Sequence, residues 1–312
     1  MRTFISGSLA YDRIMDFPGR FADHILPHKI HVLNVCFNIN GLVEKFGGTA
    51  GNIAYTLGLL GERPYIVATA GDDFSRYRDW IVSHGLSDRW VKRIPGVPTA
   101  SAYITTDQDD NQITAFNPGA MAHQAELPPL DHSSEPTQAL IGPGNKLDMA
   151  GFAAKAREAG VPFIFDPGQS LNIWEGGEIR EAVRGAAAFI SNEYELSQFL
   201  QLTGWNMDTL YRNVDIVITT RGSEGVILDR RGEKLLIPAA PVRQVLDPTG
   251  AGDAFRAGIL KGRSLGLDWD LCCQLGAVAA TYAVENYGTQ EHHFDWQTFC
   301  QRYSESYGPL VC

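Results

Sequence analysis

Cysteine is scarce in this sequence, and its few cysteines show no pattern typical of a metal or redox site. The chain has 312 residues and five cysteines, none of them in a C-x-x-C pair. Unpaired thiols are typical of a reducing compartment. The opening residues lack a basic segment followed by a long apolar one, and no run of about 18 uncharged apolar residues occurs. We therefore expect a cytoplasmic protein with no membrane partner.

The sequence also has fewer positive than negative residues. It contains 26 Lys and Arg and 36 Asp and Glu, which gives a formal net charge of -10. Nucleic acids and anionic membranes attract clustered Lys and Arg, so neither is expected as a partner. Two kinase signatures are missing as well. The chain has no G-x-x-x-x-G-K-[ST] loop and no H-R-D or D-F-G tripeptide, which excludes the Walker-type and protein-kinase classes. Any anionic ligand must be held by local groups.

Short β-like runs alternate with segments of helical spacing along most of the chain. The helical segments are 52–60, 146–159 and 194–202, and the β-like runs are 2–6, 64–70, 139–142, 162–166, 187–191 and 215–220. This alternation predicts an α/β fold whose mostly parallel sheet is covered on both faces. Ligands of such sheets bind beyond the C-terminal ends of the strands, so motifs that follow strands deserve most weight.

Two regions interrupt this alternation. Residues 12–46 show no clear βαβ unit, and residues 99–116 resemble a hairpin around the turn DQDDN. We expect the two regions to form one small β-rich lid, made of about 12–46 and 99–120 and inserted into the α/β core. Residues 1–312 are otherwise expected to form a single domain.

The glycine-rich stretch DPTGAGDAFRAG, residues 247–258, leads into an apolar pattern with helical spacing, so a helix is predicted to begin near Gly250. The first turn of a helix has unpaired N–H groups and the positive end of the helix dipole. Gly250, Ala251 and Gly252 are therefore predicted to hold a phosphate or a developing negative charge. Asp253 would lie beside them, where it can accept a proton from an attacking hydroxyl. The alternative is an ordinary, tightly packed helix start.

A second glycine cluster, FGGTAGNIAYTLGLLG at residues 46–61, also leads into a predicted helix. Gly47 and Gly48 allow the backbone to approach a ligand closely, and the amide of Asn52 can both donate to and accept from a diol. The alternative is a tight helix start with a capping amide. Neither cluster decides the function alone.

Together the two clusters resemble the characteristic patterns of the PfkB carbohydrate kinase family, also called the ribokinase family. They occur in the family's order and spacing, and the resemblance covers nearly the whole chain. It implies a ribokinase-like, doubly wound αβα sandwich with a small β-rich lid. It also implies transfer of the γ-phosphate of ATP to a hydroxymethyl group, with Asp253 as the base and Gly250–Gly252 as the anion hole.

Other segments resemble the family at the substrate and metal positions. SGSLAYD resembles its first strand and turn, which implies that Ser8 and Asp12 line the acceptor pocket. SNEYE matches its N-x-x-E pattern, which implies that Asn192 and Glu195 lie near the phosphates and the water shell of Mg²⁺. Because Mg²⁺ keeps several waters and binds few carboxylates directly, Glu195 is expected to hold it through water.

The nucleotide side is also implied by the resemblance. The family pattern places five residues along the nucleotide or around its adenine: Thr220, Gly222, Gly225, Asn286 and Gly288. Asp247 and Thr249 match part of a site that holds a monovalent cation in many relatives, which leaves activation by K⁺ open. The expected cofactors are thus ATP and Mg²⁺.

Acceptor choice is expected to depend on the lid. Residues 17–46 and 113–121 most resemble the bacterial adenosine-kinase-like branch, with Phe116 stacked on a purine and Met121 beside it. Phe116 can instead be a strand aromatic that faces the lid's own core. The preferred hypothesis is an ATP-dependent kinase acting on the 5'-hydroxyl of a nucleoside, adenosine being converted to AMP. The alternatives are a kinase for ribose, fructose or 2-keto-3-deoxygluconate, and a noncatalytic nucleoside-binding regulator. Both a monomer and a lid-mediated homodimer remain open.

Overall fold

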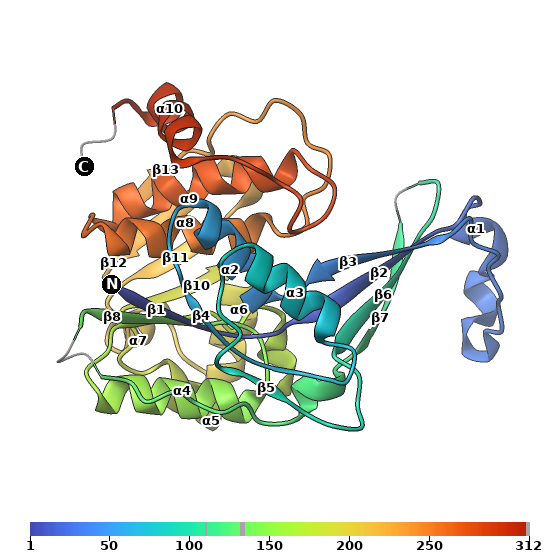
Figure 1. Ribbon diagram of the computed structural model, residues 1–312, viewed down its shortest axis with the longest axis horizontal. Helices are drawn as coiled ribbons and strands as arrows, with labels where there is room; N and C mark the ends of the chain where they lie inside the picture. Colours follow the sequence, from blue (N-terminus) through green and yellow to red (C-terminus); the bar gives the residue numbers. More distant parts are fainter. Residues whose placement is uncertain (110, 132–134, 310–312) are drawn as a thin grey trace.

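The central sheet runs through the whole body of the molecule (Figure 1). The computed structural model describes residues 1–109, 111–131 and 135–309. Within this part, nine strands lie in the order β13-β12-β11-β10-β9-β8-β1-β4-β5. All neighbours from β5 to β11 are parallel, and β12 and β13 extend the edge as an antiparallel hairpin. The strands are β1 (Arg2–Ser6), β4 (Tyr65–Ala70), β5 (Val91–Arg93), β8 (Thr137–Ile141), β9 (Phe163–Phe165), β10 (Ala188–Asn192), β11 (Val217–Thr220), β12 (Val226–Arg230) and β13 (Glu233–Ile237).

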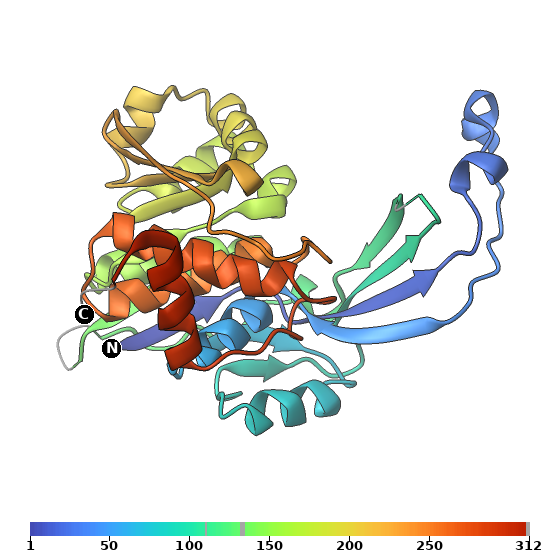
Figure 2. The ribbon, with the colours of Figure 1, turned by 90° about the horizontal axis from the view of Figure 1, so that it is seen from above.

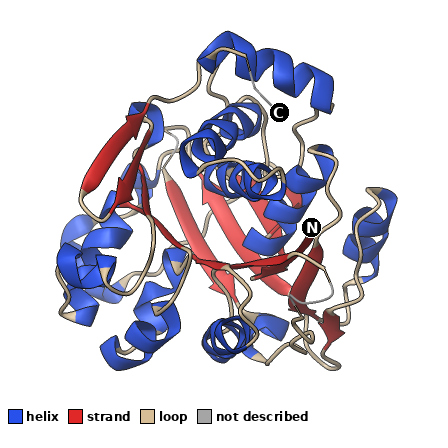
Figure 3. Cartoon of the chain, turned by 90° about the vertical axis from the view of Figure 1, so that its left-hand side faces the viewer, coloured by secondary structure: helices blue, strands red, loops and turns tan. Residues whose placement is uncertain are grey.

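Helices cover both faces of this sheet (Figure 3). Successive strand residues point to opposite faces, so Phe4 packs in one core cluster and Ile5 in the other. One face is covered by α2 (Thr49–Leu59), α3 (Ser75–Ser83), α8 (Ala251–Ser264), α9 (Trp269–Val284) and α10 (Trp296–Tyr307). The other face is covered by α4 (Lys146–Glu158), α5 (Gly176–Val183), α6 (Glu193–Thr203) and α7 (Met207–Tyr211). This arrangement confirms the predicted αβα sandwich.

A second, four-stranded sheet projects from the body in both ribbon views (Figures 1 and 2). Its order is β3-β2-β6-β7, with β2 and β6 parallel and the two outer pairs antiparallel. This sheet is the predicted lid. Its strands are β2 (Ala10–Asp16), β3 (Leu42–Gly47), β6 (Ala100–Thr106) and β7 (Gln112–Asn117), and η2 (Gly119–Ala122) leads back to the body.

The outer end of the predicted β-rich lid is helical, which the sequence did not indicate. Residues 17–41 contain the short helices α1 (Phe21–His24) and η1 (Pro27–Val32) instead of strands. Phe17, Phe21 and Phe37 pack together there, with ring centroids 4.7–5.6 Å apart. Pro27 begins η1, because proline fits the first helical turn but cannot continue a preceding helix. Across the described residues, no helix combines the length and apolarity needed to span a bilayer.

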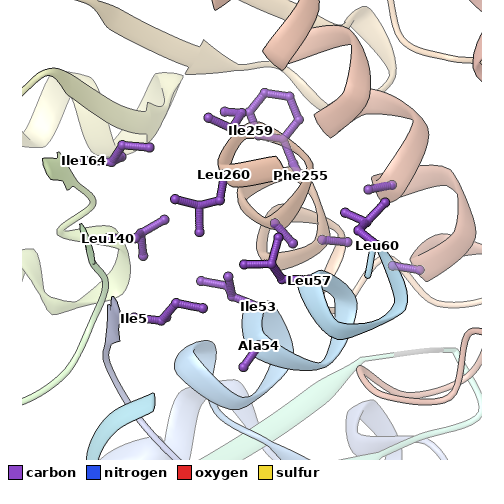
Figure 4. Packing of buried hydrophobic residues seen from close by; sticks show 14 of the residues in the cluster. Ile5, Ile53, Ala54, Leu57, Leu60, Leu140, Ile164, Phe255, Ile259 and Leu260 are labelled. Carbon is purple, nitrogen blue, oxygen red and sulfur yellow. The ribbon is translucent and has the colours of Figure 1, made fainter. Parts of the chain in front are cut away.

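Two helices are locked together over the middle of the sheet (Figure 4). Ile53 and Leu57 of α2 lie beside Leu260 of α8, and all three side chains are buried. Burying a side chain of this size contributes about 1.5–3 kcal/mol. The relative position of α2 and α8 is therefore fixed by a dry core just below the first turns of both helices.

Candidate active site

The core contact between α2 and α8 brings two predicted site residues together. Asn52 directly precedes Ile53, and Asp253 lies two turns before Leu260 on the same side of α8. The amide Nδ2 of Asn52 donates a hydrogen bond of 2.8 Å to Oδ2 of Asp253. The structure thus aims Asn52 at the predicted base.

Burial dominates the electrostatics of Asp253 and raises its pKa to about 6. The hydrogen bond from Asn52 and the positive charge of Arg256 lower this pKa, whereas the negative charges of Asp166 and Asp12 raise it. A carboxylate with a pKa near 6 is ionised at neutral pH and is still basic enough to take a proton. Asp253 is therefore suited to general-base chemistry.

The first turn of α8 presents backbone N–H groups beside this carboxylate. Gly250 caps the helix in the left-handed conformation, with φ of +80°. The N–H of Ala251 donates to the carbonyl of Pro248 at 3.3 Å. Within the described ranges, the N–H groups of Gly250, Gly252 and Asp253 have no acceptor. Unpaired N–H groups at a helix start attract anions.

A buried ion pair that the sequence did not reveal braces this turn. Arg256, one turn after Gly252, donates to Asp166, which follows β9, through Nε and through Nη2, the latter at 2.8 Å. Its Nη1 also donates to the carbonyl of Gly252 at 2.9 Å. Burial alone would disfavour the charge on each residue and would lower the pKa of Arg256. The negative charge of Asp166 and its hydrogen bond outweigh this effect, so the pKa of Arg256 is raised. Only the packing of α8 against β9 identifies this pair.

On the lid side, Asp12 of β2 lies against the paired glycines. A Cβ on Gly47 would collide with the Asp12 carboxylate. Gly48 adopts φ of +88°, and a Cβ there would lie 2.6 Å from the nitrogen of Ala10 and 2.7 Å from the carbonyl oxygen of Ser8. Position 48 therefore requires glycine, whereas a larger residue at position 47 would displace the Asp12 carboxylate. Burial, reinforced by the charge of Asp247, raises the pKa of Asp12 to about 6.

Ser8 is engaged at the start of α2. Its Oγ accepts from the N–H of Thr49 at 3.0 Å, which supplies one of the missing acceptors of that helix start. Phe116 on β7 is 51% exposed. It lies opposite Ala102, which in turn lies opposite Asp12, so Phe116 and Asp12 share one face of the lid. Phe116 therefore does not fill a lid core. Met121 lies in η2, half-buried, and its carbonyl accepts from Asn145.

Asn192 and Glu195 form a reciprocal capping box at the start of α6. Oδ1 of Asn192 accepts from the N–H of Glu195 at 2.7 Å, and Oε2 of Glu195 accepts from the N–H of Asn192 at 2.8 Å. The other carboxylate oxygen, Oε1, has no hydrogen-bond partner in the described part of the chain. Burial raises the pKa of Glu195, and the charge of Asp166 adds to this while that of Arg256 opposes it. Glu195 thus belongs to the same cluster as the ion pair.

The remaining nucleotide-side residues follow β11 and α9. Thr220 ends β11, while Gly222 and Gly225 bound the short helix η4 (Gly222–Glu224) with φ of +56° and +92°. Asn286 follows α9 and donates from Nδ2 to the carbonyl of Tyr282 at 2.8 Å, so its side chain is used in ending that helix.

Asp247 ties the two C-terminal loops together. Its Oδ1 accepts from the N–H of Thr249 at 2.9 Å and its Oδ2 from the N–H of Gly288 at 3.0 Å. Gly288 needs its φ of +95° for this approach. Asp247, Thr249 and Gly288 are therefore neighbours, although they were assigned to two different ligands.

A buried polar network behind Asn52 was not found from the sequence. Nε2 of Gln290 donates to Oδ1 of Asn52 at 3.0 Å and to the hydroxyl of Tyr77 at 2.7 Å. Tyr77 donates in turn to the carbonyl of Gly47 at 2.7 Å, and Nε1 of Trp80 donates to Oε1 of Gln290 at 2.8 Å. No motif marks Gln290 or Tyr77, because their role depends on contacts with residues about 200 positions away.

A half-buried carboxylate at a helix start with unpaired N–H groups, below a β lid, is the arrangement expected of a phosphotransferase site in the ribokinase-like fold. Residues 23–296 match the family described as pfkB family carbohydrate kinase. The chain belongs to the PfkB family and is a phosphotransferase with an alcohol group as acceptor.

Several similar proteins are nucleoside kinases. A nucleoside kinase of Methanocaldococcus jannaschii is 30% identical over 272 residues, which cover 86% of this chain and 89% of that protein. Its crystal structure superposes with a TM-score of 0.87 at 28% identity, covering 97% of this chain and 98% of that one. The Burkholderia thailandensis nucleoside kinase in complex with inosine gives a TM-score of 0.88 at 37% identity, covering 98% of each chain. The same protein in complex with ADP-inosine gives a TM-score of 0.85 at 38% identity, covering 98% of this chain and 96% of that one.

Proposed function

We propose that this protein is an ATP-dependent nucleoside kinase that phosphorylates the 5'-hydroxyl of adenosine to give AMP. The observation that carries the proposal is the position of Asp253, a carboxylate with a pKa of about 6 beside unpaired helix N–H groups. The resemblance to nucleoside kinases, one of them in complex with the purine nucleoside inosine, supports the acceptor class.

In this mechanism Asp253 accepts the proton of the acceptor hydroxyl as its oxygen attacks the γ-phosphorus, and the bond from phosphorus to the ADP oxygen breaks. The N–H groups of Gly250 and Gly252 face the charge that develops on the transferred phosphoryl group. Asp12 accepts hydrogen bonds from the hydroxyls of the sugar. Positioning and electrostatics carry the reaction, as expected for phosphoryl transfer.

ATP is proposed as the donor, and the complex of a similar enzyme with ADP-inosine supports a nucleotide beside the acceptor. Thr220, Gly222, Gly225, Asn286 and Gly288 would line the nucleotide.

The residues at the phosphate side also fit Mg²⁺. The free Oε1 of Glu195 provides a suitable oxygen for a water of Mg²⁺, which neutralises phosphate charge when bound. Asp247 and Thr249 join the two loops at which we place a monovalent cation such as K⁺.

Phe116 is the proposed purine platform. It shares its face of the lid with Asp12, so a ribose held by Asp12 places its base toward the exposed ring of Phe116. Stacking on an aromatic ring contributes about 1–3 kcal/mol per base. Residues of about 12–46 and 99–120 would then form the lid of one domain, in a cytoplasmic enzyme that is a monomer or a lid-mediated homodimer.

The test is the kcat/KM of the purified enzyme with Mg-ATP and a panel of acceptors: adenosine, inosine, cytidine, ribose, fructose and 2-keto-3-deoxygluconate. We expect adenosine to be used best, and Phe116→Ala to raise the KM for adenosine by roughly tenfold or more. Ile113→Ala is the matched control, because Ile113 is also exposed but lies on the opposite face of β7. Preference for a sugar would contradict the acceptor assignment. Absence of acceptor-dependent ATP consumption would favour a binding protein.

A further inference from the structure

Gln290 is a buried amide whose orientation is fixed by a group that can only donate. Its side chain is 3% exposed. The indole Nε1–H of Trp80 has no acceptor capacity, so the atom of Gln290 that it contacts at 2.8 Å must be the oxygen. The NH₂ group of Gln290 then faces the other way, toward Asn52 and Tyr77. Trp80 therefore determines which end of Gln290 donates.

This direction is passed on to Asn52. Because Gln290 donates to Asn52, the atom of Asn52 on that side must be the carbonyl oxygen, at 3.0 Å. The Nδ2 of Asn52 consequently points to Asp253 and donates to it at 2.8 Å. We propose that Gln290 is a positioning residue that holds the Asn52 amide with its N–H toward Asp253 and so keeps this carboxylate ready to act as the base.

A second branch connects the same amide to the acceptor side. The other N–H of Gln290 donates to the Tyr77 hydroxyl, whose own proton is used for the carbonyl of Gly47. Gly47 lies directly against the Asp12 carboxylate. Gln290 therefore braces the backbone beneath Asp12 and the amide that contacts Asp253 at the same time.

The alternative orientation of Asn52 has a definite chemical consequence. With its carbonyl toward Asp253, Asn52 would accept from the protonated carboxyl and repel the ionised one, which raises the pKa of Asp253. The charged groups that act on Asp253 are Arg256 on α8, Asp166 after β9 and Asp12 on β2. None of them is changed by a substitution at Gln290, so a change in titration reports on the amide.

The test is Gln290→Met, which keeps the length of the side chain and removes its donor. This inference rests on the proposed role of Asp253, so the assay uses whichever acceptor the wild-type enzyme prefers. We expect the acid limb of kcat/KM to move up by about one pH unit, with a several-fold loss near pH 5.5 and a nearly unchanged plateau near pH 9. Gln290→Glu accepts where Gln290 donates and also adds a negative charge, so it should move the limb further in the same direction, and Gln290→Met remains the variant that reports on the amide alone.

Loss of packing alone lowers activity at all pH values and leaves the acid limb in place. A folded Gln290→Met variant with the wild-type acid limb would therefore overturn the inference. If both Gln290 variants fail to fold, Trp80→Phe can be used instead, because it removes the N–H that orients Gln290. An acid limb of kcat/KM at the wild-type position in that variant would also overturn the inference. NMR titration of carbon-13-labelled aspartate measures the pKa of Asp253 without turnover. An upward shift of this pKa in the Gln290 variants supports the role of Gln290 in orienting Asn52, even if the protein phosphorylates no nucleoside. The inference can therefore be judged separately from the proposed function.

Discussion

Replacing the proposed base should make the protein inactive and more stable at once. Asp253→Asn keeps an oxygen that can accept from Asn52 and leaves the first turn of α8 intact, but it removes the proton acceptor. General-base catalysis contributes typically 10²–10⁴-fold, so kcat should fall by about that factor while nucleotide binding changes little.

The gain in stability follows from the pKa of Asp253. Burial raises this pKa from 3.8 to about 6, so the folded state binds the proton more tightly than the unfolded state does. The carboxylate therefore costs stability as pH rises from about 4 to 6, and the full cost is present above that range. One pKa unit corresponds to about 1.4 kcal/mol. Asp253 is half-buried, and contact with solvent reduces the effect, so we expect a gain of about 1–2 kcal/mol at pH 8.

Two measurements on the same pair of proteins check this prediction. Steady-state kinetics at pH 8 gives the loss in kcat, and denaturant unfolding at pH 8 and pH 4 gives the change in the free energy of unfolding. The stabilisation should be present at pH 8 and small at pH 4, where the wild-type carboxyl is protonated in the folded state. Equal stabilisation at both pH values would refute the electrostatic argument, and an unchanged kcat would refute the role as base.

Two further substitutions test the scaffold of the site. Gly48→Ala should cost at least about 2 kcal/mol of unfolding free energy, because the φ of +88° is combined with a Cβ 2.6 Å from the nitrogen of Ala10; Gly61→Ala, with φ of +85° and open space, should cost only about 1 kcal/mol. If Gly48→Ala and Gly61→Ala lose the same unfolding free energy, the predicted clash with Ala10 does not contribute. Arg256→Met should destabilise by about 3–5 kcal/mol in urea unfolding, because it strands the Asp166 carboxylate, and adding Asp166→Leu should recover much of the loss. No recovery in the double variant would contradict an unpaired charge as the cause.

The repetitive part of the fold could be predicted from local patterns. The bounds of strands such as β1 and helices such as α4 were predicted to within one or two residues. A buried parallel strand and an amphipathic helix each have a short-range pattern of apolar residues that the sequence shows directly. The β12–β13 hairpin was missed. Its edge strand β13 is exposed over four of its five residues, and its charged start gives no clear alternation. The helical outer end of the lid was also missed, because a cluster of three aromatic rings is formed by residues 20 positions apart.

The candidate site divides along the same line. Asp253, Gly250 and Gly48 stand in contiguous motifs whose backbone requirements are local, so the sequence marks them. Asp166 and Gln290 do not stand in such motifs, and each matters only through one partner brought close by the fold. Asn52 was expected to contact the sugar diol; its hydrogen bond to the Asp253 carboxylate could not be predicted from the sequence, because the two residues are 201 positions apart.

The network around Asp253 also has a consequence for how the protein acquires activity during folding. Its contacts join residues 201 and 238 positions apart in the chain. Contacts of such separation form late, after local helices and hairpins, because a long loop must close first. During refolding, helical structure should therefore return before enzymatic activity does. Any condition that detaches Gln290 from Asn52 should lower activity at acidic pH while most of the secondary structure persists.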